Sequence, residues 1–194
     1  MAILGRIRKI MRYAVACFLV GLLFFGGHLA LLQATGNFHT VIPGQLYRSA
    51  QPSGAQLETY VHQYGIKTIV NLRGSNDQPW YQEETAVARR LGVQHIDFRM
   101  SATKILTVDK AIALIDIMKT APRPILVHCM SGADRTGLFS LIYSYEVAGV
   151  PGDVAEWQLS VLFGHIGVPY LSASFAMDRS WQDLEHHLDV KQGG

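Results

Sequence analysis

The hydrophobic pattern opens with one long apolar run. Residues 13–32 read YAVACFLVGLLFFGGHLALL and carry no formally charged side chain. About twenty apolar residues, at a helical rise of about 1.5 Å each, cover the roughly 30 Å hydrocarbon core of a bilayer. Core helices of soluble proteins are usually shorter and amphipathic. The run therefore predicts a transmembrane helix, with residues 1–36 forming a basic N-terminus plus this anchor.

The charges on either side of the run predict its orientation. The next basic residue after it is Arg48, whereas four precede it: Arg6, Arg8, Lys9 and Arg12. Cytoplasmic flanks of membrane helices carry the excess of Lys and Arg. We therefore expect a single-pass protein with a cytoplasmic N-terminus and the remaining chain on the outer, periplasmic face.

A cleaved signal peptide is the alternative to an anchor. A signal peptide has a basic start, an apolar stretch and then a cleavage site. This sequence has the first two and continues with LQATG, in which Ala34 would precede the cleavage site. The apolar stretch is longer than the usual length of about 7–15 residues, and Leu32 is not the small residue preferred there. We expect an uncleaved anchor; a cleaved signal would give a secreted protein.

Beyond the anchor, residues 37–194 alternate between strand-like and helix-like patterns. Alternating or β-branched runs predict strands within residues 38–52, 66–74, 93–99 and 125–128. Apolar residues at helical spacing predict helices at residues 53–65, 77–92, 107–121, 136–149, 151–167 and 172–188. Ser53 and Gln56 form a capping-box pattern at the first of these helices, and Gly65 ends it. Such alternation with short connections predicts an α/β fold, a central, mostly parallel sheet flanked by helices.

Composition narrows the class of protein. A chain of 194 residues with 49% hydrophobic and 16% charged residues has room for one ordinary domain with a core. The formal net charge of +2 becomes −2 once the four cations before the apolar run are removed, so we expect no nucleic-acid partner. One of the two cysteines, Cys17, lies in the apolar run, which excludes a disulfide framework for the domain. The sequence favours no particular oligomeric state.

The sequence HCMSGADRTG, residues 128–137, lies between the last predicted strand and the helix that follows it. In open α/β sheets, ligands gather at this carboxyl edge, where helix N-termini point. We expect the backbone N–H groups here to form an anion-binding nest, with Gly132 at positive φ. The same partial charges would stabilise a thiolate at Cys129. The predicted phosphate-binding residues are Met130, Ser131, Gly132, Ala133, Asp134 and Arg135.

This pattern resembles the signature of the cysteine-dependent protein tyrosine and dual-specificity phosphatases, which is Cys, five residues, Arg, then Ser or Thr. The stretches LYRSAQPS, IVNLRG, MSATK and RPILVHCMSGADRTGL are similar to a group of small bacterial and fungal dual-specificity-type phosphatases. The resemblance covers most of residues 38–150. It implies that residues 37–194 form a dual-specificity phosphatase-like catalytic domain with a cysteine-phosphatase-like fold.

The resemblance also implies a role for each signature residue. Cys129 would attack phosphorus and form a phosphocysteine intermediate. Arg135, with the loop amides, would bind the phosphoryl oxygens. Thr136 would donate its hydroxyl to the departing thiolate, and His128 would support the loop from behind. We expect neither a metal ion nor an organic cofactor.

The chain departs from the family pattern at the general acid. Family members place an Asp on a separate loop, but the corresponding stretch FRMSATKILTVDK has no acid at the expected position. Asp134, directly before Arg135, resembles the Asp-Arg pairing of myotubularin-type loops. We assign the acid to Asp134, with Asp97 and Asp109 as alternatives. Asp134 could instead only orient Arg135 or cap the helix.

The predicted activity is hydrolysis of phosphate monoesters, on phosphotyrosine and also phosphoserine or phosphothreonine of proteins, at the membrane. A lipid phosphate such as phosphatidylglycerophosphate or a phosphoinositide is the alternative substrate. Readings of another class are a rhodanese-like sulfurtransferase and an inactive phosphate-binding module. Arg48 and Arg73 either brace the loop or form surface salt bridges. Lys104 either faces the pocket or is solvated.

Overall fold

The computed structural model describes the backbone of residues 2–192 and the side chains of residues 6–188. It divides the chain into two units, residues 1–35 and 36–194. The first unit is helix α1 (Ala2–Ala34), which contains the predicted apolar run. Its stretch Arg6–Ala34 is long and apolar enough to cross a membrane, a property that a signal sequence near the N-terminus shares.

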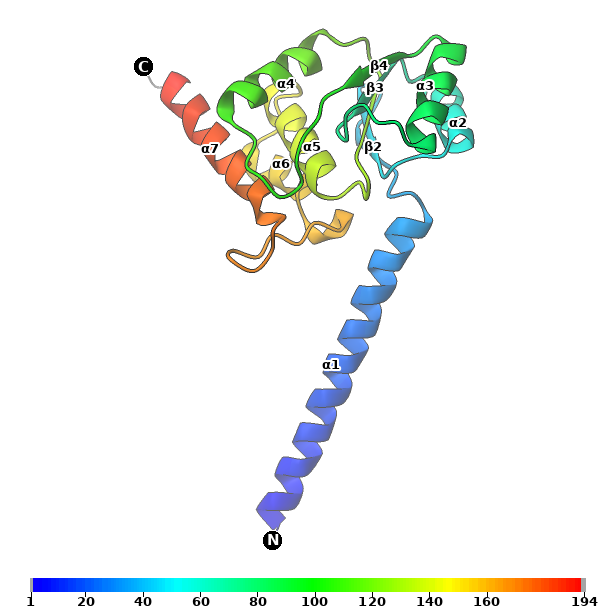
Figure 1. The fold of residues 1–194 in the computed structure, drawn as a ribbon. Coiled ribbons are helices and arrows are strands. Elements are labelled where there is room, and N and C mark those ends of the chain that lie inside the picture. Colours follow the sequence, from blue (N-terminus) through cyan, green and yellow to red (C-terminus); the bar gives the residue numbers. More distant parts are fainter. Residues whose placement is uncertain (1, 193–194) are drawn as a thin grey trace. The chain divides into compact units, whose positions relative to one another are not determined.

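The second unit is built on a five-stranded sheet in the order β1-β2-β5-β3-β4. Only the β1–β2 pair is antiparallel, so the sheet is mostly parallel as predicted. Figure 1 shows its strands between two groups of helices. The strand bounds are β1 His39–Ile42, β2 Leu46–Ser49, β3 Thr68–Asn71, β4 Gln94–Asp97 and β5 Ile125–His128.

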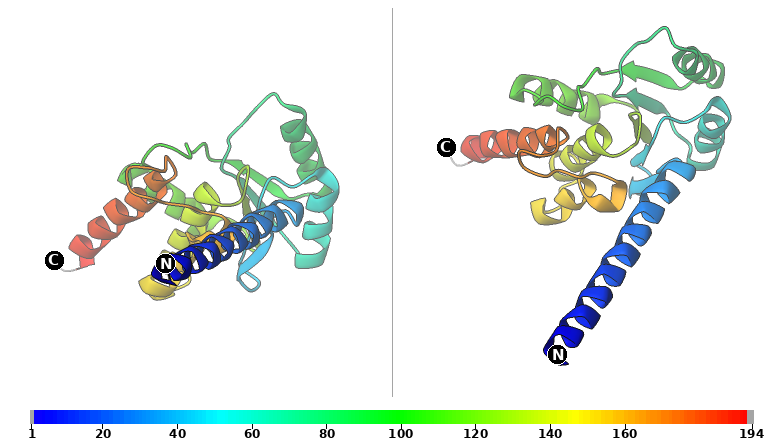
Figure 2. Two further views of the ribbon diagram at one scale, coloured as in Figure 1. Left: turned by 90° about the horizontal axis from the view of Figure 1, so that it is seen from below. Right: turned by 60° about the horizontal axis from the view of Figure 1, so that its bottom comes forward.

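Helices cover both faces of this sheet. Helices α2 and α3 lie on one face, and α4, α5 and α7 lie on the other (Figures 1 and 2). Each face has its own cluster of buried apolar side chains, which confirms the predicted α/β architecture. The helix bounds are α2 Gly54–Tyr64, α3 Pro79–Leu91, α4 Val108–Thr120, α5 Asp134–Glu146, α6 Gly152–Ala155 and α7 Phe175–Gln192.

Strand β5 delivers neighbouring residues to opposite faces of the sheet, because side chains alternate along a strand. Leu126 packs in the cluster that includes Leu57 of α2, whereas Val127 packs with Leu138 of α5. Continuing this alternation, His128 faces α3, and Cys129 lies in the cluster on the α5 face. The adjacent residues His128 and Cys129 are therefore directed to different layers of the domain.

The predicted helix over residues 151–167 is wrong. The chain forms only the short α6, two 3-10 turns (η1 Glu156–Gln158 and η2 Val161–Phe163) and an irregular stretch before α7. Gly164 takes a left-handed conformation with φ of 86°, which ends helical winding. Side chains from elsewhere in the fold take up the carbonyl oxygens of Gln158 and Phe163. Tertiary hydrogen bonds have replaced the helical ladder.

Candidate active site

The signature loop joins β5 to α5 at the carboxyl edge of the sheet. Cys129 directly follows β5 and is 1% exposed, whereas Met130 is exposed. Gly132 has φ of +73°, as predicted. A Cβ at this glycine would lie 2.7 Å from the backbone nitrogen of Ala50 and 2.8 Å from the backbone of Ser49. Both the conformation and the close approach of β2 therefore require glycine.

Four consecutive carbonyl oxygens of the loop accept hydrogen bonds from outside it. The bonds are Gln51 N to Met130 O at 3.2 Å, Asn37 Nδ2 to Ser131 O at 3.0 Å, and the Arg48 guanidinium to Gly132 O at 2.8 Å and Ala133 O at 3.4 Å. In a planar trans peptide, the carbonyl and the following N–H point in opposite directions. The N–H groups of residues 131–134 are thereby directed toward the inside of the loop, with one long contact of 3.4 Å between Ala133 N–H and Ser131 Oγ.

Arg48 supports the loop through the hydrogen bonds that it donates to the loop carbonyls. It is fully buried, and besides the loop carbonyls it donates to Gln158 at the backbone oxygen (2.7 Å) and at Oε1 (2.9 Å). Its guanidinium lies 4.1 Å from the centre of the Phe163 ring. Burial lowers the pKa of Arg48 to about 9, so the group is a cation at neutral pH. Arg48 is a brace of the loop, and the alternative of a surface salt bridge is wrong.

Arg73 reaches the loop indirectly. Its Nη1 donates to Gln51 Oε1 at 2.9 Å, and its guanidinium lies 3.7 Å from the Trp80 ring centre. Burial, and then the charge of the neighbouring Arg135, lower the pKa of Arg73. Since Gln51 N–H holds the Met130 carbonyl, Arg73 positions the residue that supports the start of the loop.

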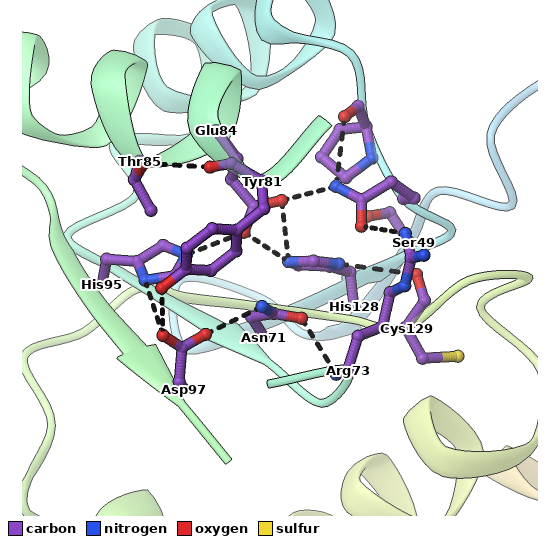
Figure 3. Close-up of polar contacts among 12 residues, drawn as sticks. Ser49, Asn71, Arg73, Tyr81, Glu84, Thr85, His95, Asp97, His128 and Cys129 are labelled. Carbon is purple, nitrogen blue, oxygen red and sulfur yellow. Dashed lines mark hydrogen bonds and ion pairs between the residues drawn. The ribbon is translucent and has the colours of Figure 1, made fainter. Parts of the chain in front are cut away.

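A buried carboxylate lies behind the loop (Figure 3). Glu84 of α3 is 1% exposed and accepts hydrogen bonds from His128 Nε2 at 3.2 Å, His95 Nε2 at 2.7 Å and Gln51 Nε2 at 2.5 Å. Burial would raise the pKa of Glu84, but the hydrogen bond and charge of His128, with the other two donors, outweigh it and lower the pKa to about 2. His128 Nδ1 lies 3.5 Å from Cys129 O.

Sequence reasoning missed Glu84, although a signal for it exists. Glu84 lies three and four residues before Val87 and Ala88, which are buried on the same face of α3. A glutamate on the apolar face of an amphipathic helix needs a buried partner. The histidine of the signature loop is that partner.

Arg135 and Thr136 lie in the first turn of α5, directly after the loop. Arg135 Nη1 makes only long contacts, 3.5 Å to Leu72 O and 3.4 Å to Met100 O. Arg135 Nε and the hydroxyl of the fully buried Thr136 have no hydrogen-bond partner within the part of the chain that the structure describes. Buried donors are normally satisfied; Arg48 Nε, Ser140 Oγ and Ser160 Oγ also lack a partner in this part of the chain.

The three aspartates considered for the general acid lie in different settings. Asp134 has a side chain that is 24% exposed, and its Oδ1 lies 2.7 Å from Nδ1 of His165, which is another residue that sequence reasoning missed. Asp97, at the end of β4, accepts from Asn71 Nδ2 at 2.8 Å and from the Tyr81 hydroxyl, a bond that raises the pKa of Tyr81 to about 12 (Figure 3). Asp109 is exposed in the first turn of α4.

The mostly parallel sheet, the central strand β5 that Cys129 directly follows and the loop whose carbonyls face outward together make up the arrangement of a cysteine-based phosphatase. The chain belongs to the tyrosine phosphatase family, whose pattern matches residues 26–160.

Known proteins of this class are similar to the chain. The dual specificity protein phosphatase TpbA of Pseudomonas aeruginosa is 30% identical over 113 residues, which are 58% of this chain and 48% of that protein. The chain thus spans about half the length of the curated relatives it matches. The TpbA crystal structure superposes with a TM-score of 0.61 at 23% identity, over 79% of this chain and 89% of that one.

Two further solved structures share the fold. A TpbA variant in complex with pTyr matches with a TM-score of 0.55 at 23% identity, over 74% of this chain and 91% of that one. The catalytic core of the PP-IP phosphatase SIW14 of S. cerevisiae, in complex with citrate, matches with a TM-score of 0.59 at 21% identity, over 81% of this chain and 93% of that one.

Proposed function

We propose that this chain is a membrane-anchored, cysteine-dependent phosphatase that hydrolyses phosphate monoesters of proteins, on phosphotyrosine and also on phosphoserine or phosphothreonine. The observation that carries the proposal is the set of four loop carbonyls held outward beside Cys129. It leaves N–H donors facing inward, where a phosphate dianion would bind. The name of the relative TpbA, a dual specificity protein phosphatase, supports the same reaction.

In the first step, the Cys129 thiolate attacks phosphorus and a sulfur–phosphorus bond forms as the phosphorus–oxygen ester bond breaks. The N–H groups of residues 131–134 and the Arg135 guanidinium bind the three phosphoryl oxygens as charge develops on them. The leaving oxygen takes a proton from Asp134 and departs as an alcohol. The unpartnered Nε of Arg135 supplies one of the required donors.

In the second step, water attacks the phosphocysteine. The new phosphorus–oxygen bond forms as the sulfur–phosphorus bond breaks, and the water proton passes to the Asp134 carboxylate. Thr136 stabilises the departing thiolate through its hydroxyl, the buried donor that has no partner in the described part of the chain. Inorganic phosphate leaves and the enzyme returns to its starting state.

Hydrolysis of a phosphotyrosine peptide by the full chain in detergent micelles tests this proposal. Wild-type protein should release phosphate with inhibition by vanadate, and acid quenching should trap a phosphoryl group on the protein. Cys129→Ser should abolish both signals and still bind the peptide. Unchanged turnover by Cys129→Ser would overturn the proposal.

A lipid phosphate is the second candidate substrate, and a groove near the Met100–Leu106 stretch favours it. The groove of about 620 Å³ is lined by the cations Lys104 and Arg179 and also by the exposed Tyr170 and Leu171. Cations beside exposed apolar side chains suit a surface of anionic lipids. Vesicles containing phosphatidylglycerophosphate or a phosphoinositide, compared with phosphopeptides at equal phosphate, decide between the two substrates.

Anchoring and orientation are part of the proposal. The stretch Arg6–Ala34 would cross the membrane with the N-terminus in the cytoplasm, and a connection of four residues leads from Ala34 to β1 at His39. A reporter fused to the C-terminus should be active only in its periplasmic form, and the N-terminal sequence of the purified protein separates an anchor from a cleaved signal.

The remaining readings have simple assays. A sulfurtransferase would convert thiosulfate and cyanide to thiocyanate, and a silent phosphate-binding module would bind vanadate without turnover of any aryl phosphate. Membership of the tyrosine phosphatase family weighs against both.

A further inference from the structure

His165 lies between two carboxylates that come from different helices. Its Nδ1 is 2.7 Å from Oδ1 of Asp134 on α5, and its Nε2 is 3.0 Å from Oδ2 of Asp178 on α7. The residue is 3% exposed and comes from the irregular stretch that replaces the predicted helix. A buried histidine therefore connects Asp134 of the signature loop with a second carboxylate.

The number of protons in this cluster follows from the geometry. A neutral imidazole has one N–H group and can donate to one carboxylate, leaving its other nitrogen lone pair facing the second. Both contacts are favourable only when an additional proton is present. In one arrangement that proton is on the ring, which is then a cation between two carboxylates. In the other arrangement it is on Asp134 or Asp178, and the ring is neutral. In both arrangements the cluster has a net charge of −1.

The electrostatic surroundings favour retention of this proton. Burial would lower the pKa of His165, but the hydrogen bonds to Asp134 and Asp178, with their charges, outweigh it and raise the pKa above the ordinary 6.5. The charged groups that contact the ring are these two aspartates, from α5 and α7. Arg48 of β2 and His39 of β1 contact Phe163, which lies two residues before His165 on the same segment.

We propose that His165 is a positioning residue that supplies the catalytic proton to Asp134, and that Asp178 fixes the ring so that Nδ1 faces Asp134. This inference rests on the proposed phosphatase function. As the ester bond breaks, the one additional proton of the cluster moves from His165 Nδ1 to Asp134 and from Asp134 to the leaving oxygen. The ring becomes neutral and keeps its Nε2–H bond to Asp178. The alcohol leaves uncharged, and the cluster gains one negative charge.

The cluster is restored during hydrolysis of the phosphocysteine. Asp134 takes a proton from the attacking water, and that proton returns along the same hydrogen bond to Nδ1 of His165. The imidazolium and both carboxylates are regenerated, so the proton balance over one cycle closes without another donor. One loop carboxylate thus serves as acid and then as base.

A purely structural role for His165 is the competing explanation, and the fold provides a control for it. Asn37 fastens the same segment to the same loop, since its Nδ2 donates to Ser131 O at 3.0 Å and to Phe163 O at 2.9 Å. Asn37 does not titrate. Asn37→Ala therefore reports what loosening the segment does when no proton is involved.

The test measures kcat/KM against pH on an alkyl phosphate, whose leaving oxygen needs a proton, and on a nitrophenyl phosphate, which needs little assistance. His165→Gln should lower kcat/KM on the alkyl ester by roughly tenfold or more and change it far less on the aryl ester. In the plot of kcat/KM against pH for the alkyl ester, the decrease at high pH (the high-pH limb) should begin at a lower pH than in the wild type. The reason is that the proton must then reside on Asp134 alone.

The other variants complete the series. Asp178→Asn should move the limb in the same direction by a smaller amount, because one of the two carboxylates that stabilise the imidazolium is lost. Asn37→Ala should leave the limb in place. Equal losses on both esters with an unmoved limb in His165→Gln would overturn the proposal.

A measurement on the wild-type chain keeps the test independent of variant folding. Nitrogen NMR shifts of the His165 ring, read together with the carboxyl carbon shifts of Asp134 and Asp178, should report protons on both ring nitrogens at pH 7, or one on the ring with Asp134 protonated. A neutral ring with both aspartates ionised would overturn the proposal. If wild-type protein hydrolyses no phosphate monoester, the proposed function fails, whereas an active enzyme whose variants behave as simple structural losses refutes only the role of His165.

Discussion

The Glu84 carboxylate lies 3.2 Å from Nε2 of His128, and both residues are buried. Glu84 belongs to α3, on one face of the sheet, and His128 is the last residue of β5. The next residue, Cys129, packs on the opposite face of the sheet. The same carboxylate accepts from Gln51, whose backbone N–H holds the loop at Met130. The position of the nucleophile loop thus depends on a carboxylate on the opposite side of the sheet.

Removal of this carboxylate should destabilise the domain. Glu84→Ala leaves buried donors of His128, His95 and Gln51 without their acceptor, and we expect a loss of about 3 kcal/mol in the free energy of unfolding. Urea denaturation followed by circular dichroism measures it. The exposed neighbour Glu83 is the control, and Glu83→Ala should change stability by less than about 0.5 kcal/mol. Equal effects of the two variants would contradict this prediction.

The same pair predicts how stability depends on acidity. The pKa of Glu84 is lowered to about 2 in the folded state from an ordinary 4.5. Its contribution is therefore present above pH 4.5 and is lost as the pH falls toward about 2. Denaturation curves at pH 6, 4 and 3 should show wild-type protein losing stability faster than Glu84→Gln. Equal losses of stability in the two proteins would show that another group causes the loss of stability at low pH.

Gly132 should tolerate no side chain. Its positive φ disfavours any L-residue, and a Cβ would lie 2.7 Å from the nitrogen of Ala50, which belongs to the backbone and cannot move aside. Gly132→Ala should abolish turnover and lower the melting temperature. Gly149 has a similar φ of +67° and open space around its Cβ position, so Gly149→Ala should cost only about 1 kcal/mol and keep kcat. Similar behaviour of both variants would refute the steric argument.

Loss of the Arg48 guanidinium should release the loop carbonyls. Arg48→Met keeps most of the buried volume but removes the donors to Gly132 O, Ala133 O and Gln158, and we expect about 3 kcal/mol of destabilisation with a raised KM. Arg48→Lys should not rescue it, because an ammonium group cannot reproduce the planar fork. The exposed Arg90, paired with Glu58 at 2.9 Å, provides the control. Arg90→Met should leave the urea midpoint nearly unchanged, because an exposed ion pair contributes little to stability.

Local patterns in the sequence were sufficient for the elements and for the place of the loop. The capping box of Ser53 and Gln56 and the end of the helix at Gly65 occur in the structure as predicted, because each depends on residues within one helical turn. Gly132 has the predicted positive φ for the same local reason. Alternation of strand and helix patterns predicted the mostly parallel sheet.

The sequence alone therefore determined the α/β class, a long apolar N-terminal helix and a cysteine loop at a strand-to-helix turn, since all three follow from neighbouring residues. Only the tertiary structure decided what surrounds that loop. Asn37 and Arg48 reach contacts 94 and 110 residues away, and His165 meets Asp134 across 31 residues. These partners come together through the order of the strands and the packing of helices on both faces. The segment that was expected to be helical is irregular because its carbonyls serve those distant side chains.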